Sequence, residues 1–279
     1  MRLIGEDGVA AYGVIMYVNF IFVAIFIGYA IGSAPLVGYH YGAENYDELS
    51  KKAAEIIAGQ MKEKSNSVLG LATGSTPVGT YKELVAMYNN GEIDFKDITT
   101  VNLDEYKGLD PKNDQSYRYF MQTNLFDHVN VVPEKTFVPD GTIADSAKAC
   151  SDYDKVIEAT GGIDLQLLGL GHNGHIGFNE PAEYYTKGTH CVKLTDSTIN
   201  ANSIYFASID EVPKEAYTMG IGTIMSAAKV LIIVSGKSKA PIIKEILTGP
   251  ITPKVPATAL LLHRDCIMIV DKDAYSEME

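Results

Sequence analysis

A short polar stretch near the middle of the chain contains the side chains best suited to proton transfer. Residues Leu167 to Pro181 read LLGLGHNGHIGFNEP, which brings Asn173, His175 and Glu180 close together. An imidazole that titrates near neutrality beside a carboxylate is a common acid–base pair. The alternative is a strand-to-loop turn whose polar side chains only satisfy backbone groups.

A pair of carboxylates forms a second motif. Asp104 and Glu105 come directly after the apolar run Ile98 to Leu103. Neighbouring side chains of an extended segment point to opposite sides. We therefore expect one carboxylate to enter a cleft, where it could act as a base, and the other to point elsewhere.

A third motif is suited to an anion. Small and hydroxyl-bearing residues stand just before Pro77: Thr73, Gly74, Ser75 and Thr76. Glycine, hydroxyls and the start of a helix supply donors for an anion, most naturally a phosphate. The Gly-Lys-Ser/Thr ending of a Walker loop is absent, and a helix N-cap with proline in its first turn fits equally well. Lys239, after a later apolar run, could add a positive charge.

These motifs share a position relative to the predicted strands. Apolar runs alternate with helix-like segments along the chain after residue 45: Ser67–Ala72, Ile98–Leu103, Ile163–Leu170, Val230–Val234 and Cys266–Val270. Such alternation predicts an α/β fold with a mainly parallel, doubly wound (Rossmann-like) sheet and helices on both faces. Because ligands bind at the carboxyl ends of strands in these sheets, we expect the motifs to form one site.

Composition narrows the functional classes. The 279 residues carry a formal net charge of −12, which argues against nucleic-acid binding. Three scattered cysteines without metal-site spacing are typical of a reducing cytosol, so we predict a cytoplasmic catalytic domain. His172 and His175 lack the further ligands of a zinc site, so no metal is expected.

The first 45 residues differ from the rest. Residues 8–43 contain no Asp, Glu, Lys or Arg, and Val14 to Leu36 is long enough to cross a bilayer roughly 30 Å thick. We therefore divide the chain into an apolar, helical, transmembrane-like segment (1–45) and a catalytic domain (46–279). Membrane contact through residues 10–38, with tethering of the enzyme, and a buried helix of a soluble protein are both open interpretations.

Part of this segment resembles a known family. Gly5 to Asn45, and above all IGSAPLVGYHYGAEN from Ile31 to Asn45, is similar to a piece of a multidrug and toxic compound extrusion transporter. The piece is small, and a lone helix has no partners with which to line a transport pathway. No transport function is inferred.

The domain from about Tyr46 to Asp273 resembles the glucosamine-6-phosphate deaminases. The resemblance rests on several motifs together: LATGSTP ending at Pro77, NLDEY ending at Tyr106, GHNGHIGFNEP ending at Pro181 and TMGIGT starting at Thr218. Related lactonases share the fold and the phosphate loop but lack the NLDEY and GFNEP signatures.

The resemblance implies a cofactor-free conversion of glucosamine 6-phosphate to fructose 6-phosphate and ammonia. It implies that His175 handles the proton of the ring hydroxyl, with Glu180 supporting the imidazole and Asn173 completing the group. Asp104 would move the C2 proton to C1, while the Thr73–Thr76 loop and Lys239 hold the phosphate. The expected partner is thus a small sugar phosphate, and the oligomeric state is open.

Two departures from the family pattern have consequences. Ile204 stands where the family usually has an arginine that grips the phosphate, which predicts weaker substrate binding. Transporter-like sequence also stands where the family has a short strand before the first helix, which predicts a missing edge strand. The alternatives are a sugar-phosphate sensor with little or no turnover, or a related sugar-phosphate isomerase or lactonase.

Overall fold

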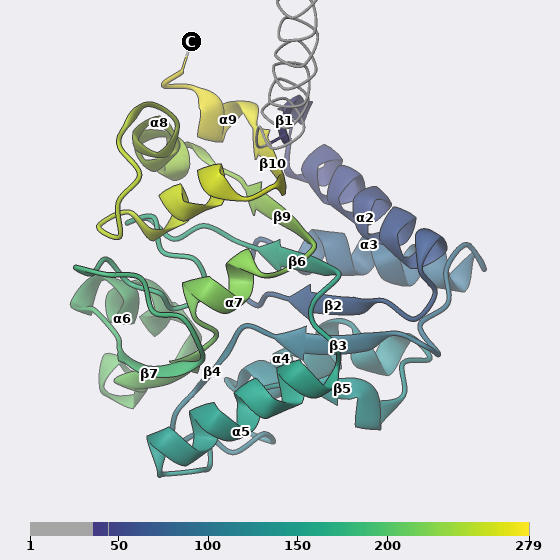
Figure 1. The fold of residues 1–279 in the computed structure, drawn as a ribbon, viewed down its shortest axis with the longest axis horizontal. Helices are drawn as coiled ribbons and strands as arrows, with labels where there is room; N and C mark the ends of the chain where they lie inside the picture. Colours follow the sequence, from purple (N-terminus) through teal and green to yellow (C-terminus); the bar gives the residue numbers. More distant parts are fainter. Residues whose placement is uncertain (1–35, 44, 279) are drawn as a thin grey trace, which may run out of the picture. The chain divides into compact units, whose positions relative to one another are not determined.

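A seven-stranded sheet forms the centre of the catalytic domain (Figure 1). The computed structural model describes residues 36–43 and 45–278, and one compact unit comprises Val37–Glu279. The strands run across the sheet in the order β1 (Leu36–Ala43), β10 (Asp265–Asp271), β9 (Lys229–Val234), β6 (Leu165–Leu168), β2 (Val68–Leu71), β3 (Thr99–Asn102) and β5 (Thr136–Phe137). From β10 to β5 every neighbouring pair is parallel. The predicted α/β class and mainly parallel sheet are confirmed.

Helices connect these strands. The longer ones are α2 (Tyr46–Glu63), α3 (Val78–Asn89), α4 (Tyr117–Asn124), α5 (Ser146–Ala159) and α8 (Ala240–Thr248); α6 (Asp196–Asn202), α7 (Ile221–Met225) and α9 (Lys272–Tyr275) are shorter. The chain passes from β2 to β3 to β5, then returns through β6, β9 and β10. Right-handed connections therefore place α3 and α4 on one face and α5, α7 and α8 on the other. α2 lies beside α3, as Figure 1 shows.

Local signals explain why α2 begins where it does. The Asn45 side chain accepts hydrogen bonds from the backbone N–H groups of Asp47 and Glu48, both at 3.1 Å. Those two acidic residues also stand in the first turn, where the helix dipole favours negative charge. One face of α2 is buried, including Leu49 and Ile57.

A second, smaller sheet extends the carboxyl end of β3. It has the order β4 (Asp104–Tyr106), β8 (Glu215–Thr218), β7 (His190–Lys193), and both pairs are antiparallel. Asp104 lies opposite Thr218 in this pairing. The second motif is therefore held by β8 rather than left in a free loop.

The direction in which strands are added reverses between β2 and β6. These two strands are neighbours, yet the chain leaves β2 toward β3 and leaves β6 toward β9. Their following loops diverge, so a crevice opens between them, and open α/β sheets bind ligands at this point. The loops that flank it contain the Thr73–Thr76 motif and the His175 motif.

The N-terminal part differs from what the sequence predicted. Leu36–Ala43 forms β1 beside β10, so the prediction of a missing edge strand is wrong: transporter-like sequence supplies a strand at that edge. The predicted apolar helix and nearly all of residues 10–38 lie outside the described residues. Among the helices that the structure does describe, none is both long and apolar enough to cross a membrane.

One glycine of the central sheet is required by its neighbour. The Gln166 side chain of β6 is fully buried and lies across Gly70 of β2, where a Cβ would come within 2.1 Å of Gln166 Oε1. Only hydrogen fits at that position unless the amide moves into a filled core.

We expect Gly70→Ala to destabilise the domain by about 1–3 kcal/mol through overpacking. Gly59→Ala is the matched control, since Gly59 is exposed within α2 and a Cβ there meets nothing within 4 Å. This control should gain about 0.5–1 kcal/mol, because alanine is the better helix former. Urea unfolding of both variants measures the difference, and equal stabilities would contradict the packing argument.

Candidate active site

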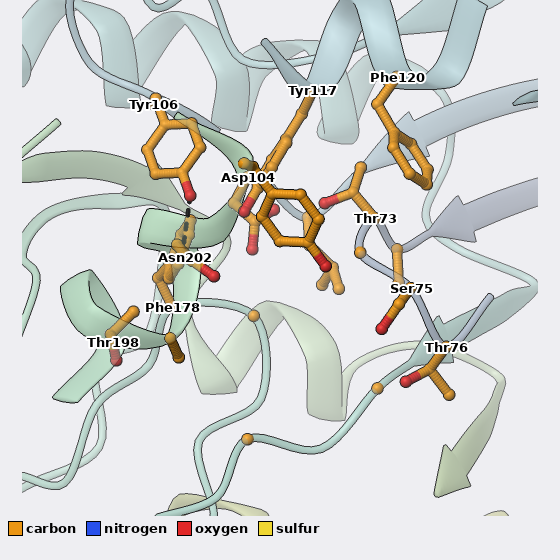
Figure 2. Close-up of a pocket in the computed structure, with 18 of the residues that line it drawn as sticks. Thr73, Ser75, Thr76, Asp104, Tyr106, Tyr117, Phe120, Phe178, Thr198 and Asn202 are labelled. Atoms are coloured by element: carbon orange, nitrogen blue, oxygen red, sulfur yellow. Dashed lines mark hydrogen bonds between the residues drawn. The ribbon is translucent and has the colours of Figure 1, made fainter. Parts of the chain in front are cut away.

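A cavity of about 590 Å³ lies at the carboxyl ends of the central strands (Figure 2). Its lining includes residues that follow four of them: the Thr73–Thr76 loop after β2, Asp104 after β3, His175 after β6 and Lys239 after β9. The volume is in the range of small-molecule sites. Asn173 and Glu180 do not line this cavity but stand behind His175.

The phosphate-loop candidate is shaped by one glycine and held by a distant tyrosine. Gly74 has φ +95°, a conformation that favours glycine. The Tyr46 hydroxyl lies 3.1 Å from both the Ser75 and Thr76 carbonyl oxygens, and it accepts a 2.8 Å hydrogen bond from Gly79 N–H at the start of α3. Sequence analysis missed Tyr46 because nothing in the loop itself indicates its partner.

His175 is held by a turn that excludes larger residues. A Cβ on Gly171 would lie 2.3 Å from the imidazole ring, so the ring packs directly against that backbone. Gly171 N–H donates to the His175 carbonyl at 2.9 Å, and His175 N–H donates to Asn173 Oδ1 at 3.2 Å. Nδ1 of the imidazole lies 3.5 Å from Glu180 Oε2.

Both oxygens of Glu180 have partners. Oε2 accepts a 2.7 Å hydrogen bond from Asn173 Nδ2, while Oε1 accepts from the hydroxyls of Thr198 and, at 3.3 Å, Thr195. Burial alone would raise the pKa of Glu180, but His175 and these donors outweigh it and lower the pKa to about 2. The carboxylate is thus ionised beside the imidazole. The two threonines were missed because they begin α6, far along the chain.

The paired carboxylates separate as alternation predicted. Asp104 lines the cavity and is only 5% exposed; its burial, followed by the charge of Glu105, raises its pKa to about 8. Glu105 points away from the cavity and accepts backbone hydrogen bonds from Tyr106, Tyr117 and Arg118 at 2.8–3.0 Å.

Lys239 supplies the positive charge. It is the only Lys or Arg among the described residues that line the cavity. Its Nζ donates to the Leu170 carbonyl at 2.7 Å, and burial lowers its pKa to about 8. Ile204 lines the same cavity and is 77% exposed, and its hydrocarbon side chain can give a phosphate neither a hydrogen bond nor a charge.

An aromatic group forms one wall. The rings of Tyr117 and Phe178 stack at 5.9 Å, and Tyr106 lies 4.9 Å from Tyr117. The Tyr106 hydroxyl accepts a 2.9 Å hydrogen bond from Asn202 (Figure 2). Of these residues, sequence analysis quoted Tyr106 and Phe178 within motifs but gave no sign that the rings would meet.

Comparison with known proteins agrees with this arrangement. The family described as glucosamine-6-phosphate isomerases/6-phosphogluconolactonase matches residues 42–268, and the MatE family matches residues 1–58. The glucosamine-6-phosphate deaminase of Clostridium perfringens is 56% identical over 231 residues, which is 83% of this chain and 96% of that protein. The chain therefore belongs to the glucosamine-6-phosphate isomerase/6-phosphogluconolactonase family.

Solved structures support the same fold. A monomeric glucosamine-6-phosphate deaminase is 46% identical with a TM-score of 0.83, covering 84% of this chain and 98% of that one. The 6-phosphogluconolactonase of Thermotoga maritima shares the fold at 21% identity and a TM-score of 0.62, covering 80% of this chain and 95% of its own.

The depressed pKa of Glu180 leads to a pH-dependent stability. A carboxylate whose pKa falls from 4.5 to about 2 on folding stabilises the protein above pH 4.5, and this contribution is lost as the pH falls toward 2. We expect Glu180→Gln to lose about 1–2 kcal/mol at pH 7, after allowance for solvent screening, and almost nothing near pH 2. Denaturant unfolding across this range measures the difference.

Glu183→Gln is the matched control for that experiment. Glu183 has an 83% exposed side chain that pairs loosely with Lys254 at 3.6 Å, and exposed pairs contribute little. Its loss should stay below about 0.5 kcal/mol at every pH. A Glu180→Gln effect independent of pH would refute the assignment of a strongly stabilised carboxylate.

Proposed function

We propose that this protein converts glucosamine 6-phosphate and water to fructose 6-phosphate and ammonia. The observation that carries the proposal is the convergence of Asp104, His175 and the Thr73–Thr76 loop on one cavity, although they lie far apart in the sequence. The high identity to glucosamine-6-phosphate deaminases supports this chemistry over that of the more distant lactonases.

The phosphate of the substrate would bind at the loop after β2. Figure 2 shows the side chains of Thr73, Ser75 and Thr76 along one side of the cavity. Hydroxyls and backbone N–H groups of this loop, with α3 beginning just after it, suit a dianion. Lys239 adds a positive charge, and its burial strengthens its attraction for a phosphate. Such local donors are needed because the whole protein carries a net charge of −12.

His175 would open the sugar ring. Its imidazole takes the proton of the C1 hydroxyl and returns a proton to the ring oxygen as the C1–O bond breaks. Glu180 stabilises the imidazolium that forms meanwhile, and Asn173 holds that carboxylate at 2.7 Å. The two threonines on its other oxygen prevent it from turning away from the ring.

Asp104 would then carry out the isomerisation. Its carboxylate removes the proton from C2 of the open-chain sugar while O1 takes up the proton that the substrate ammonium gives up, which forms an enolamine. Asp104 then delivers the C2 proton to C1, leaving an iminium at C2. Water adds there and ammonia departs, which yields the ketose. Burial makes Asp104 a stronger base than an exposed aspartate, because its pKa is raised to about 8.

The test is ammonia release from glucosamine 6-phosphate by the full chain and its Asp104→Asn variant. Loss of the base should lower kcat/KM by about 10²–10⁴-fold. Asp104 must be ionised to accept a proton, so kcat/KM of the unaltered protein should rise with pH through about 8. Asp97→Asn is the control, since that exposed carboxylate pairs only with Lys135, at 3.7 Å.

The sensor alternative makes the opposite forecast. A sensor would be stabilised against unfolding by glucosamine 6-phosphate yet release no ammonia, and Asp104→Asn would leave that stabilisation intact. The presence of Asp104, His175 and Glu180 argues against a sensor, whereas Ile204 leaves it open. A folded full chain that binds but does not turn over the substrate would put the sensor ahead of the enzyme.

Ile204 allows a separate test of the phosphate end. We expect Ile204→Arg to lower KM for glucosamine 6-phosphate by about tenfold or more, equivalent to about 1.4 kcal/mol, with little change in kcat. The added guanidinium would contact the phosphate equally in ground and transition states. Ile204→Ala serves as the control for losing the apolar side chain, and equal KM values for the two variants would contradict this placement of the phosphate.

A further inference from the structure

Glu105, the carboxylate that faces away from the cavity, has a position that the proposed reaction leaves unexplained. We propose that Glu105 is a positioning residue: its side chain ties the strand that carries Asp104 to the helix that walls the cavity, and its negative charge adds to the effect of burial on Asp104. This inference rests on the proposed function for the role of Asp104.

The contacts of Glu105 connect two elements. Oε1 accepts hydrogen bonds from the N–H groups of Tyr106 at 2.8 Å and Tyr117 at 2.9 Å, and Oε2 accepts from Arg118 at 3.0 Å. Tyr117 and Arg118 are the first two residues of α4, whose N–H groups have no partners within the helix. A side chain of β4 therefore caps α4, and it is only 2% exposed.

The position of α4 determines the shape of the cavity. Tyr117 and Phe120 of this helix both line it, and Tyr117 stacks on Phe178 at 5.9 Å. The Ser116 hydroxyl caps the next N–H, that of Tyr119, at 3.0 Å. Glu105 and Ser116 thus each accept hydrogen bonds from N–H groups at the start of α4. Of the two, only Glu105 lies in β4, the strand that carries Asp104.

The charge of Glu105 also acts electrostatically on Asp104, its neighbour in β4. Burial raises the pKa of Glu105 to about 7, opposed by its three backbone donors, and the pKa of Asp104 to about 8. With those donors and the helix dipole, Glu105 ionises first. Its charge then makes ionisation of Asp104 more difficult, because a second negative charge on the neighbouring buried residue is repelled.

Other groups near the pair are accounted for. Those that surround it are Tyr106 and Tyr217 from the strands, Tyr117 and Arg118 from α4, Asp140 from the loop before α5, Tyr153 from α5 and His175 across the cavity. Burial raises the pKa of Tyr106 to about 12 and also raises the pKa values of Tyr117 and Tyr153, so these three hydroxyls stay neutral, while Arg118 stays charged. Of these groups, Glu105 is the one that directly follows Asp104 in β4, and its charge raises the pKa of Asp104.

The experiment compares Glu105→Gln, Glu105→Asp and Ser116→Ala in the full chain. Glu105→Gln removes the charge, so the acidic limb of kcat/KM should move to lower pH by about half a unit or more. Glu105→Asp keeps the charge and should keep the limb near its original place. Ser116→Ala also weakens the start of α4 but changes no charge, so it should lower Tm without moving the limb.

A readout independent of turnover separates this inference from the proposed function. Carboxyl ¹³C NMR titration, assigned with Asp104→Asn, should show a lower Asp104 midpoint in Glu105→Gln than in the unaltered protein. Absence of ammonia release by the unaltered protein would overturn the deaminase proposal alone. An Asp104 midpoint and an acidic limb that stay unmoved in Glu105→Gln would overturn the inference about Glu105.

Discussion

The parallel pairing of β2 with β6 is the constraint on which the rest of the structure depends. Because the chain reverses its direction of travel between these neighbours, their following loops separate and leave room for a ligand. β3 and β9 then flank the crevice and bring one residue each: Asp104 from one side, Lys239 from the other. Asp104, His175 and the Thr73–Thr76 loop meet at one cavity because of strand order, before any side-chain contact is considered.

The placement of residues after strands could be predicted from the sequence, whereas their partners could not. Apolar runs mark β2, β3 and β6, so the motifs that follow them were bound to share an edge of the sheet. Alternation was enough to separate Asp104 from Glu105. Tyr46, Thr195 and Thr198 carry no such signal, because each acts on a motif far away in the chain through a single hydroxyl. The edge strand β1 was missed because its residues read as part of an apolar run.

The substrate and the protein as a whole carry charges of the same sign. A chain of net charge −12 acts on an anionic substrate, yet Lys239 is the one Lys or Arg among the described residues that line the cavity. The negative groups are kept apart by their environments. Glu180 is surrounded by donors and stays ionised, while Asp104 is buried and holds its proton until higher pH. Two similar carboxylates, one in the cavity wall and one behind it, therefore differ in protonation state near neutral pH.

The place of β1 at the edge of the sheet also bears on how such a chain can arise. The strand lies beside β10 and is separated from β6 by β10 and β9, whereas Thr73–Thr76, Asp104, His175 and Lys239 follow strands further in. A fusion point upstream of α2 therefore changes the edge strand of the domain and leaves the residues after the inner strands unchanged. Backbone pairing accepts many sequences at such a border, so unrelated coding sequence can be recruited there as a strand.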